Sequence, residues 1–361
     1  MLKKAVFPSK YLQGAGALTE LPALCAALGS RAMILASPTA ASQVLAKARV
    51  DWAAEGIAIE VFQGECCEEE LARVAELIKR KKITVLVGMG GGKTIDTAKI
   101  AADRARIAVV VVPTIASTDA PTSGCAVLYS KDGIFDKVFY QRSNPDAVLV
   151  DTAVIAAAPT RFLVSGMGDA LATWFEAQSC VRTTSVNECG GLCTAAGLSI
   201  ARLCYDTLLS YGDAARIAND QHVVTPALER IVEANILLSG LGFESAGLAA
   251  AHAIHNGLTA LPETHAFYHG EKVAFGVLAG LQLSDAAPAD VDAVYTFCEK
   301  VGLPTTLAAL GLAKVSPQAL AKAAAMACAP EQSIHHEAGT ITPEKTLAAM
   351  IAADAIGRSR Q

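Results

Sequence analysis

The chain has 361 residues, which corresponds to two domains at roughly 150 residues per domain. Hydrophobic residues make up 52% and charged residues 18% of the sequence, a composition that argues against disorder and for much surface hidden inside the protein or between the subunits of a homo-oligomer. The formal net charge is −5 and no basic block is present, so nucleic acid is not an expected partner.

Neither a membrane span nor a secretion signal is expected. The apolar runs, such as Ile107 to Val112, end well before the roughly 18 to 20 residues that a transmembrane helix requires. The N-terminal segment carries lysines but no apolar stretch that would make a signal peptide. The 10 cysteines are irregularly spaced, without a CxxC pair or a zinc-finger spacing. We therefore expect a cytoplasmic protein with buried thiols and no membrane partner.

The first 150 or so residues alternate short β-branched runs with amphipathic stretches. The runs predict five strands: Ala32–Ala36, Ile57–Phe62, Ile83–Val87, Ile107–Val112 and Ala147–Val150. Residues 40–48 and 68–79 between them have helical spacing and composition. Because parallel strands need crossover connections that cover both faces of a sheet, this alternation predicts an α/β domain with a doubly wound, mainly parallel sheet over residues 1–158. Ligands bind such domains at the carboxyl ends of the strands.

After Pro159 the sequence is rich in Ala, Leu and Glu and poor in β-branched clusters, which predicts an all-α domain over residues 159–361. The main expected helices are Phe162–Cys180, Asn187–Ser210, Pro226–Ser239, Gly247–Thr259, Glu271–Ser284 and Pro317–Cys328, with Gly240, Gly242 and Pro262 as helix ends. No internal repeat or low-complexity linker separates the two parts. We therefore expect them to pack together with a cleft between them.

A glycine-rich segment follows the expected strand that ends at Val87. Residues 88–99 read GMGGGKTIDTAK, and a helix that begins near Thr94 would point its amino end at the turn. Glycines let backbone N–H groups approach a phosphate closely, and the helix dipole favours an anion there. The segment matches neither GxGxxG, because Lys93 replaces the third glycine, nor a P-loop, which has one more residue between its glycines. A phosphate cradle and a tight turn without a ligand both fit the sequence.

A polar loop at residues 113–125 follows the next expected strand. It reads PTIASTDAPTSGC and carries several hydroxyls and a single carboxylate, Asp119. Taken alone, it fits an ordinary polar loop as well as a binding site. Because the carboxyl ends of neighbouring parallel strands lie at one edge of a sheet, this loop and the glycine-rich segment strengthen each other as candidates for one site.

Four of the seven histidines fall in one short stretch: His252, His255, His265 and His269. His252 and His255 are three residues apart on an expected helix, so both can face one side, as in metal sites and also in structural cores. His269 at an expected helix start favours a metal, and the missing ligand should be a carboxylate. Asp169 is the best candidate, because an unpaired carboxylate among apolar residues is costly to bury. It also fits a first-turn helix residue stabilised by the dipole, and the sequence leaves both interpretations open.

Together these segments resemble the iron-containing (group III) alcohol dehydrogenase superfamily, and within it the glycerol dehydrogenase branch. The resemblance covers essentially the whole chain through residues 88–99, 116–123, 166–170, 240–245, 247–257 and 269–276, which read GMGGGKTIDTAK, ASTDAPTS, GMGDA, GLGFES, GLAAAHAIHNG and HGEKVAFG. Each segment is moderately specific, and their order along the chain is strongly so. The resemblance implies a dehydroquinate synthase-like architecture, in which a dinucleotide-binding α/β domain precedes an all-α metal- and substrate-binding domain.

By this resemblance, Asp169, His252 and His269 would be catalytic and would bind one divalent metal, which is zinc in glycerol dehydrogenases and iron in some relatives. The wider iron-dependent family has a further histidine where this chain has Thr173, and that departure favours the zinc-using branch. Asp119 matches the position that hydrogen-bonds the polyol substrate.

The same resemblance implies NAD as the cofactor. Gly90, Gly91 and Gly92 would hold its pyrophosphate, and Thr114, Ser117, Ser123, Cys125 and Tyr129 would line the nicotinamide side. Ser37 stands where these enzymes commonly carry an acidic residue for the adenosine ribose, so the preference for NAD over NADP is weakened, although NAD is still expected. Enzymes of this branch are commonly octamers, which implies a homo-octamer here.

The implied activity is reversible, zinc- and NAD-dependent oxidation of glycerol to dihydroxyacetone. The nearest alternative is a dehydrogenase of the same family for another diol, polyol or amino alcohol, such as 1,2-propanediol. A substrate that is a phosphate ester would need Arg or Lys at its binding site, and residues 240–267 contain neither. A cyclase of dehydroquinate synthase type, which uses NAD and zinc, and a nucleotide-responsive protein without chemistry are more distant alternatives. Net accumulation of NADH would distinguish a dehydrogenase from both.

Overall fold

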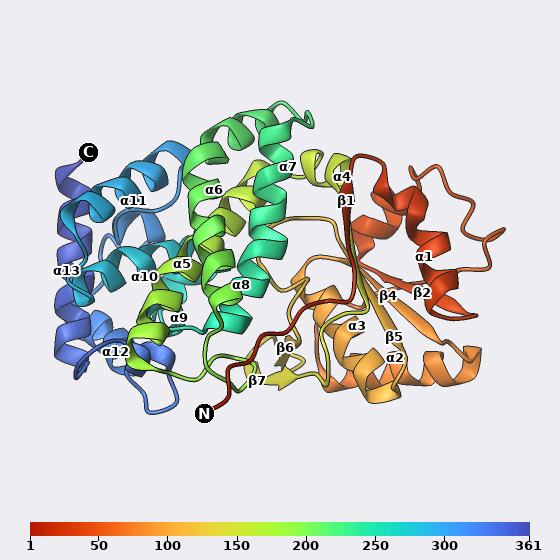
Figure 1. Ribbon diagram of the computed structural model, residues 1–361, viewed down its shortest axis with the longest axis horizontal. Coiled ribbons are helices and arrows are strands. Elements are labelled where there is room, and N and C mark those ends of the chain that lie inside the picture. The colour runs from red at the N-terminus through yellow and green to blue at the C-terminus, as the bar shows by residue number, and fades with distance from the viewer.

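A six-stranded parallel sheet organises the first half of the chain in the computed structural model, which describes residues 1–361 (Figure 1). Its strands are β1 (Tyr11–Gly14), β2 (Ala32–Ala36), β3 (Ala58–Val61), β4 (Val85–Gly90), β5 (Ala108–Pro113) and β8 (Ala147–Asp151), in the order β1-β8-β5-β4-β2-β3. The five predicted strands are confirmed, with ends shifted by up to three residues. No prediction covers β1, because its sequence YLQG has no β-branched run.

Helices cover both faces of this sheet, which confirms the predicted doubly wound class. The helices of this half are α1 (Leu21–Leu28), α2 (Glu68–Lys81) and α3 (Gly92–Ala105), with a π-helical segment at Ala40–Leu45. Side chains alternate along each strand, so Met33 and Leu35 of β2 pack in the apolar cluster of α2 and α3, whereas Ile34 packs in the cluster of α1. The helix expected at 40–48 is therefore present, but it is shorter and π-wound.

A two-stranded antiparallel hairpin interrupts the alternation of strands and helices after β5. Strand β6 (Cys125–Tyr129) pairs with β7 (Phe135–Tyr140), and the turn between them contains Gly133 with a φ of 78°. This hairpin is not predicted from the sequence, because nearly all side chains of β7 are exposed and show no apolar–polar alternation. Since β6 directly follows the polar loop at 113–125, the hairpin fixes where that loop ends.

The second half is helical, which confirms the predicted class (Figure 1). Its helices are α4 (Thr152–Ala156), α5 (Thr160–Thr183), α6 (Ala195–Asp220), α7 (Pro226–Glu233), a π-helical segment (Ala234–Leu238), α8 (Ser239–Ala246), α9 (Ala250–Leu258), α10 (His269–Leu283), α11 (Pro288–Val301), α12 (Pro317–Ala327) and α13 (Pro343–Ser359). Short 3-10 turns lie at Ala17–Glu20, Pro262–Ala266, Ala308–Leu310 and Ser333–His336. Helices α11 and α13 were not among the main predicted helices.

Two details of the predicted helices are wrong. The helix expected from Asn187 begins at Ala195, because Asn187 lies in a loop where its side-chain amide donates to Lys4 O at 2.9 Å. Gly240 and Gly242 do not end a helix but lie inside α8. A Cβ at either position would collide with a threonine side chain of a neighbouring segment, so these glycines permit close packing.

The two halves share one continuous apolar core. Its 70 buried residues include one face of the sheet and most helices of the second half. The chain passes from β8 through α4 to α5, which begins at Thr160, next to the predicted domain boundary. The first residues pack on the helical half: Lys3 forms a bridge with Leu192, and the Val6 N–H donates to Ser245 Oγ at 3.3 Å. The division at residues 158 and 159 stays a prediction.

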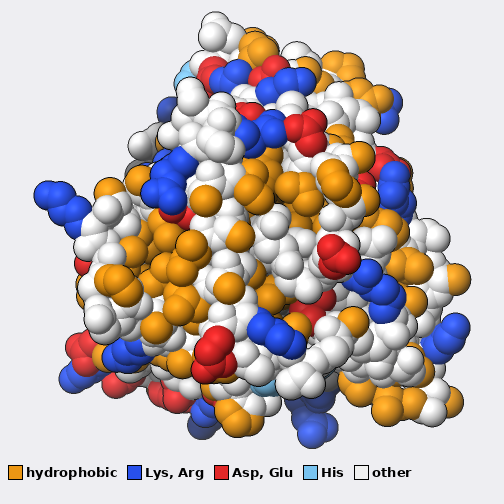
Figure 2. Space-filling view, turned by 90° about the vertical axis from the view of Figure 1, so that its left-hand side faces the viewer, with side chains coloured by type: hydrophobic (Ala, Val, Ile, Leu, Met, Phe, Trp, Pro, Cys, Tyr) orange, Lys and Arg blue, Asp and Glu red, His pale blue; other side chains and the backbone are white.

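The end of the molecule formed by α11, α12 and α13 mixes apolar, acidic and basic side chains, as Figure 2 shows. Met326 on α12 and Ile351 on α13 are exposed apolar side chains.

All 10 cysteines are free thiols. No single helix combines the length and apolar composition of a membrane span; Pro226–Ala246 and Ala250–Leu258 reach those values only as a pair, which is bent by 103°.

Candidate functional site

The glycine-rich segment lies at the point where the sheet reverses its strand order. Strand β2 leads to β3 at one edge, whereas β4 leads through α3 to β5 in the opposite direction. Ligands of doubly wound sheets bind at such switch points. The N–H of Ser37, which follows β2, donates to Met89 O in β4 at 2.9 Å. The predicted cofactor residues Ser37 and Gly90–Gly92 are therefore neighbours.

The shape of this segment suits a bound anion. At Gly90 a Cβ would lie 3.0 Å from Ser37 Cβ, so the close approach of the two loops requires glycine. At Gly92, the first residue of α3, a Cβ would meet no protein atom within 4 Å, so packing within the chain does not explain the glycine. No side chain caps the amino end of α3, which leaves its first N–H groups for a ligand. The segment fits a pyrophosphate.

The polar loop at 113–125 connects the sheet to the helical half. The Thr114 N–H donates to Gly90 O at 3.0 Å, which joins the loop to the glycine-rich segment. Ala116 O accepts a hydrogen bond from the buried Asn235 side chain at 3.0 Å, and Thr122 Oγ1 donates to a carbonyl of the same π-helical segment at 2.8 Å. The loop is thus attached to both halves.

Lys99 of α3 holds the far end of this loop. Its side chain is fully buried, and its ammonium donates to Ala120 O at 2.9 Å, to Cys125 O at 2.5 Å and to Ser123 Oγ at 3.3 Å. The carboxylate of Asp96 lies 4.0 Å from this ammonium, and burial raises the pKa of Asp96 to about 6. Neither residue is among the predicted site residues, although an acid and a lysine three residues apart on a helix are a recognisable signal.

The five residues predicted to line the nicotinamide side lie on this loop and on β6. Thr114, Ser117, Cys125 and Tyr129 are half-buried, whereas Ser123 is fully buried. The Ser123 hydroxyl contacts Lys99 within the protein, and the Tyr129 ring lies 5.1 Å from Lys93 Nζ. Burial raises the pKa of Tyr129 to about 12, so its phenol keeps its proton at neutral pH. The contacts of these residues with a cofactor stay predictions.

Asp169, His252 and His269 converge on one point. One ligand atom from each side chain lies within 4.8 Å of the others. His269 Nε2 is 3.0 Å and His252 Nε2 is 3.4 Å from Asp169 Oδ1. Asp169 is buried in the interior of α5, which begins at Thr160, so it is not a first-turn residue. Asp169 is therefore not the dipole-stabilised residue of a first helical turn that the sequence also allowed. The three predicted ligands come together from α5, α9 and α10.

The Asp169 carboxylate is the atom group that points to a cation. Its Oδ1 is buried and accepts no hydrogen bond, although two imidazole nitrogens face it. Burial raises the pKa of Asp169, but the adjacent His269 and His252 outweigh burial and hold that pKa well below its usual range. An ionised, unbonded carboxylate oxygen beside two imidazoles is a donor set for a divalent metal such as zinc or ferrous iron. The residues therefore fit the implied ion.

His252 is held by a carboxylate that the sequence analysis does not identify, Glu176 of α5. Glu176 Oε2 accepts a hydrogen bond from His252 Nδ1 at 2.6 Å. Glu176 follows Asp169 by seven residues, or two helical turns, so both carboxylates lie on one face of α5. That spacing was available in the sequence, but the pairing with His252 depends on tertiary structure.

Asp119 lies against Asp169 at the same point. Its N–H donates to Asp169 Oδ2 at 3.3 Å, and its own Oδ2 accepts from Ser239 Oγ at 2.7 Å. Burial, followed by the nearby Asp169 carboxylate, raises the pKa of Asp119 well above its usual value. Thr173 shares a hydrogen bond of 2.9 Å with Ser239 Oγ, so Thr173 supports the side chain that holds Asp119.

The other two histidines of the cluster differ in position. The His255 ring lies edge-on to the His269 ring with centroids 4.2 Å apart, and its Nδ1 contacts Asn256 Oδ1 at 3.0 Å. Burial and the neighbouring His269 hold the pKa of His255 well below its usual value. His265 is exposed and contacts Thr259 O at 3.0 Å. His255 therefore packs beside the three converging residues, and His265 lies outside them.

Comparison with known proteins identifies the family. Residues 8–152 match the model of iron-containing alcohol dehydrogenases. The chain is 49% identical to glycerol dehydrogenase of Thermotoga maritima over 100% of its own length and 99% of that protein. The chain belongs to the iron-containing alcohol dehydrogenase family. Among solved structures, a probable glycerol dehydrogenase from Sinorhizobium meliloti superposes with a TM-score of 0.93 at 45% identity, covering 99% of this chain and 100% of that one. Glycerol dehydrogenase from Schizosaccharomyces pombe gives 0.94 at 38% identity, covering 99% and 91%.

These comparisons confirm the resemblance drawn from the sequence segments and the oxidoreductase class that it implied. They also confirm the predicted architecture, in which an α/β half with a parallel sheet is followed by a helical half. Membership of this iron-containing alcohol dehydrogenase family supports NAD and a divalent metal as cofactors. The roles of individual site residues stay predictions.

Proposed function

We propose that the protein oxidises glycerol reversibly to dihydroxyacetone, with NAD as the hydride acceptor and zinc as the metal. The observation that carries this proposal is the convergence of Asp169, His252 and His269 beside Asp119. Glycerol as the substrate is supported by full-length relatives that are named glycerol dehydrogenases.

The proposed metal ligands suit a catalytic zinc ion, which takes three protein ligands and leaves a position for substrate. Ferrous iron accepts the same set of two histidines and one carboxylate. We favour zinc because Thr173, and not a histidine, occupies the position of the further ligand in iron-using relatives. When bound, the metal supplies Lewis-acid polarisation of a substrate hydroxyl, and the nicotinamide supplies the hydride acceptor.

The side chains around the metal ligands orient the substrate. Asp119 Oδ2 is engaged by Ser239, which leaves the other carboxyl oxygen to form a hydrogen bond with a second polyol hydroxyl. Residues 240–267, which include His252, contain no lysine or arginine. This absence of positive side chains suits an uncharged polyol better than a phosphate ester.

The cofactor is proposed to lie along the switch point of the sheet. Gly90–Gly92 and the amino end of α3 would hold the pyrophosphate. Ser37 Oγ accepts a hydrogen bond from the Ala40 N–H at 3.2 Å, so a neutral hydroxyl occupies the place where an acid would repel the 2′-phosphate of NADP. We therefore propose NAD as the preferred cofactor, with weaker exclusion of NADP than an acidic residue would give.

A reconstitution assay tests these proposals together. The protein is stripped with a chelator, reloaded with Zn²⁺ or Fe²⁺, and assayed for reduced nicotinamide with glycerol, 1,2-propanediol or an amino alcohol, using NAD or NADP. Fastest NAD reduction with glycerol after zinc loading is the expected result. Faster reaction with another alcohol would overturn glycerol as the substrate, and NAD binding without any reduction would overturn the dehydrogenase itself. Asp169→Asn serves as the control that should neither bind metal nor turn over.

The assembly and location remain predictions of the same proposal. We propose a homo-octamer in the cytoplasm, in line with the glycerol dehydrogenase branch and with the 52% hydrophobic composition. Light scattering of the purified protein at assay concentration would give the subunit number. A monomer with full activity would contradict the octamer.

A further inference from the structure

Glu176 is a buried carboxylate in an unusual environment. It lies on α5 and is only 1% exposed, and no lysine or arginine nitrogen lies within the 4.0 Å of a salt bridge; its one ionisable partner is His252. A carboxylate is costly to bury unless its oxygens are fully hydrogen-bonded. Its hydrogen bonds should therefore indicate its role.

Both oxygens of Glu176 accept hydrogen bonds from the start of α9. Oε1 accepts from the Ala249 N–H at 2.8 Å and from the His252 N–H at 3.0 Å, and Oε2 accepts from His252 Nδ1 at 2.6 Å. Helix α9 begins at Ala250, and its own N-cap residue provides no side-chain cap. Glu176 therefore supplies, from another helix, the negative charge and the acceptors that a helix amino end needs.

The same contact determines which nitrogen of His252 carries a proton. A carboxylate accepts hydrogen bonds and does not donate them, so His252 Nδ1 carries a proton, and Nε2 is the nitrogen left to bind a metal. Nε2 faces Asp169 Oδ1 at 3.4 Å, and that oxygen accepts no hydrogen bond. A proton or a metal ion can lie between these two atoms, and a metal that replaces the proton would be bound by Nε2 and Oδ1 together.

We propose that Glu176 is a positioning residue that prepares His252 to bind the metal through Nε2. The proposal rests on the proposed function, because it takes Asp169, His252 and His269 as the metal ligands. Glu176 itself does not reach the ion; it holds the tautomer of His252, the orientation of its ring and the first turn of the helix that carries it. Hydrogen bonds of this kind to a ligating histidine are typically worth about 10- to 100-fold in metal affinity.

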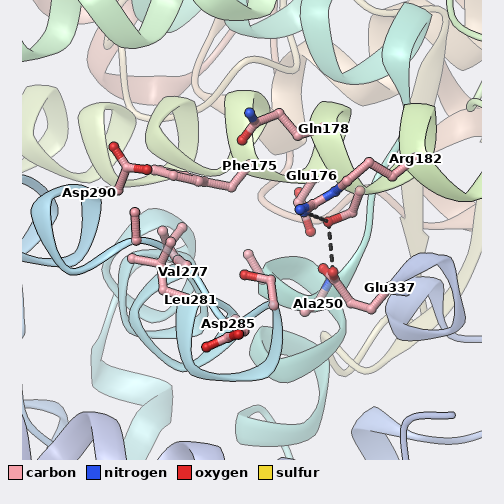
Figure 3. A pocket seen from close by; sticks show the side chains of 16 residues that line it. Phe175, Glu176, Gln178, Arg182, Ala250, Val277, Leu281, Asp285, Asp290 and Glu337 are labelled. Atoms are coloured by element: carbon pink, nitrogen blue, oxygen red, sulfur yellow. Dashed lines mark hydrogen bonds between the residues drawn. The ribbon is translucent and has the colours of Figure 1, made fainter. Parts of the chain in front are cut away.

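A second buried carboxylate at the same helix start provides a matched control. Glu337 Oε1 accepts from the Ala250 N–H at 3.3 Å, and its Oε2 accepts from Ser179 Oγ at 2.7 Å, but it does not contact His252. Both carboxylates line one cavity of about 160 Å³ (Figure 3). Replacement of Glu337 therefore perturbs the same helix end and cavity and leaves the imidazole contact intact.

The test compares Glu176→Gln with Glu337→Gln in metal-free protein. A glutamine at 176 can accept from the two backbone N–H groups through its oxygen, but its NH₂ group then faces His252 Nδ1 and drives the proton to Nε2. Competition titration with a chromophoric zinc chelator should show affinity about 10- to 100-fold weaker for Glu176→Gln. Glu337→Gln should bind zinc within about twofold of the wild type, which is under 0.5 kcal/mol.

Each outcome of this titration has a definite meaning. Equal zinc affinity of Glu176→Gln and the wild type would overturn the proposal, and so would equal losses in both variants, because Glu176 would then act only on the helix end. Failure of the wild type to bind zinc would instead overturn the proposed metal site. A second measurement needs no variant: nitrogen NMR of labelled histidine in metal-free wild type should show a proton on His252 Nδ1, whether or not Nε2 also carries one. An Nδ1 without a proton would overturn the proposal.

Discussion

Replacement of Lys99 by methionine should destabilise the protein strongly, because the lysine links α3 to the loop that carries Asp119. Methionine keeps the length and apolar contacts of the side chain but removes its charge and its donors. Two carbonyls, Ala120 O and Cys125 O, lose the ammonium. The Ser123 hydroxyl lies 3.3 Å from both carbonyls and can donate to only one. One buried carbonyl is therefore left without a partner.

The size of the effect follows from these contacts. An unsatisfied buried acceptor costs about 1–3 kcal/mol, and breaking a buried ion pair costs about 3–5 kcal/mol when the remaining group stays charged. The cost of breaking the ion pair is limited because Asp96 can become neutral. The pKa of Asp96 is already about 6 with Lys99 present. Without Lys99 this pKa rises further, so the carboxyl takes up a proton. We expect Lys99→Met to lower the free energy of unfolding by about 3–5 kcal/mol in total.

Urea titration of metal-free protein, followed by circular dichroism, measures this loss. Lys81→Met is the matched control, because Lys81 is a partly exposed lysine whose ammonium pairs with Glu60 at 2.5 Å. An exposed pair contributes at most about 1 kcal/mol, so this control should stay close to the wild type. A Lys99→Met variant as stable as Lys81→Met would refute the argument that the buried ammonium holds the loop.

Three further predictions concern the cofactor half and the loop. Burial raises the pKa of Asp96 from 3.8 to about 6, so the stability from this group is complete below pH 4 and is lost as pH rises through 6. Asp96→Asn lacks this titrating group. The free energy of unfolding of the variant minus that of the wild type should therefore rise by about 2 kcal/mol between pH 4.5 and pH 8. A difference that does not change with pH would contradict this. Gly92→Ala adds a methyl group in open space, so it should keep its melting temperature but bind NAD at least about tenfold more weakly by calorimetry, or about 1.4 kcal/mol; unchanged affinity would exclude the cradle. Gly166→Ala would place its Cβ against Ala116 O and should lose at least about 1–3 kcal/mol, so wild-type urea stability would contradict the packing.

The fold was predictable from the sequence where the residue pattern of a segment matches its burial in the folded protein. Strands β2, β4, β5 and β8 are buried on both faces, so each reads as a continuous apolar run. Strands β1 and β7 lie at sheet edges or on the surface and lack such runs. The glycines of α8 also led to a wrong prediction. Gly240 and Gly242 resemble helix-ending glycines in the sequence, but they lie inside the helix, where they permit close packing.

The candidate site was predictable only in part, for a related reason. The glycines at 90–92 and the histidine cluster carry chemistry in their residue types, so they stand out in the sequence. Glu176 and Asn235 resemble ordinary helix residues, and their roles depend on partners 76 and 119 positions away in the chain. Buried polar residues of this kind position functional groups without contacting a ligand, and only tertiary structure shows what they hold.

These buried polar contacts explain how the two packed halves keep the parts of the candidate site at fixed positions relative to each other. The loop at 113–125 is attached to the sheet half through Gly90 and Lys99. It is attached to the helical half through Asn235, and Gly124 N–H donates to the buried Glu244 Oε1 at 2.8 Å. Because both halves hold the loop at several points, a relative motion of the halves must break some of these hydrogen bonds, and each broken buried bond costs about 1–3 kcal/mol. The loop therefore helps to set the separation between the glycine-rich segment and the three converging residues, which the proposed hydride transfer would require to be short.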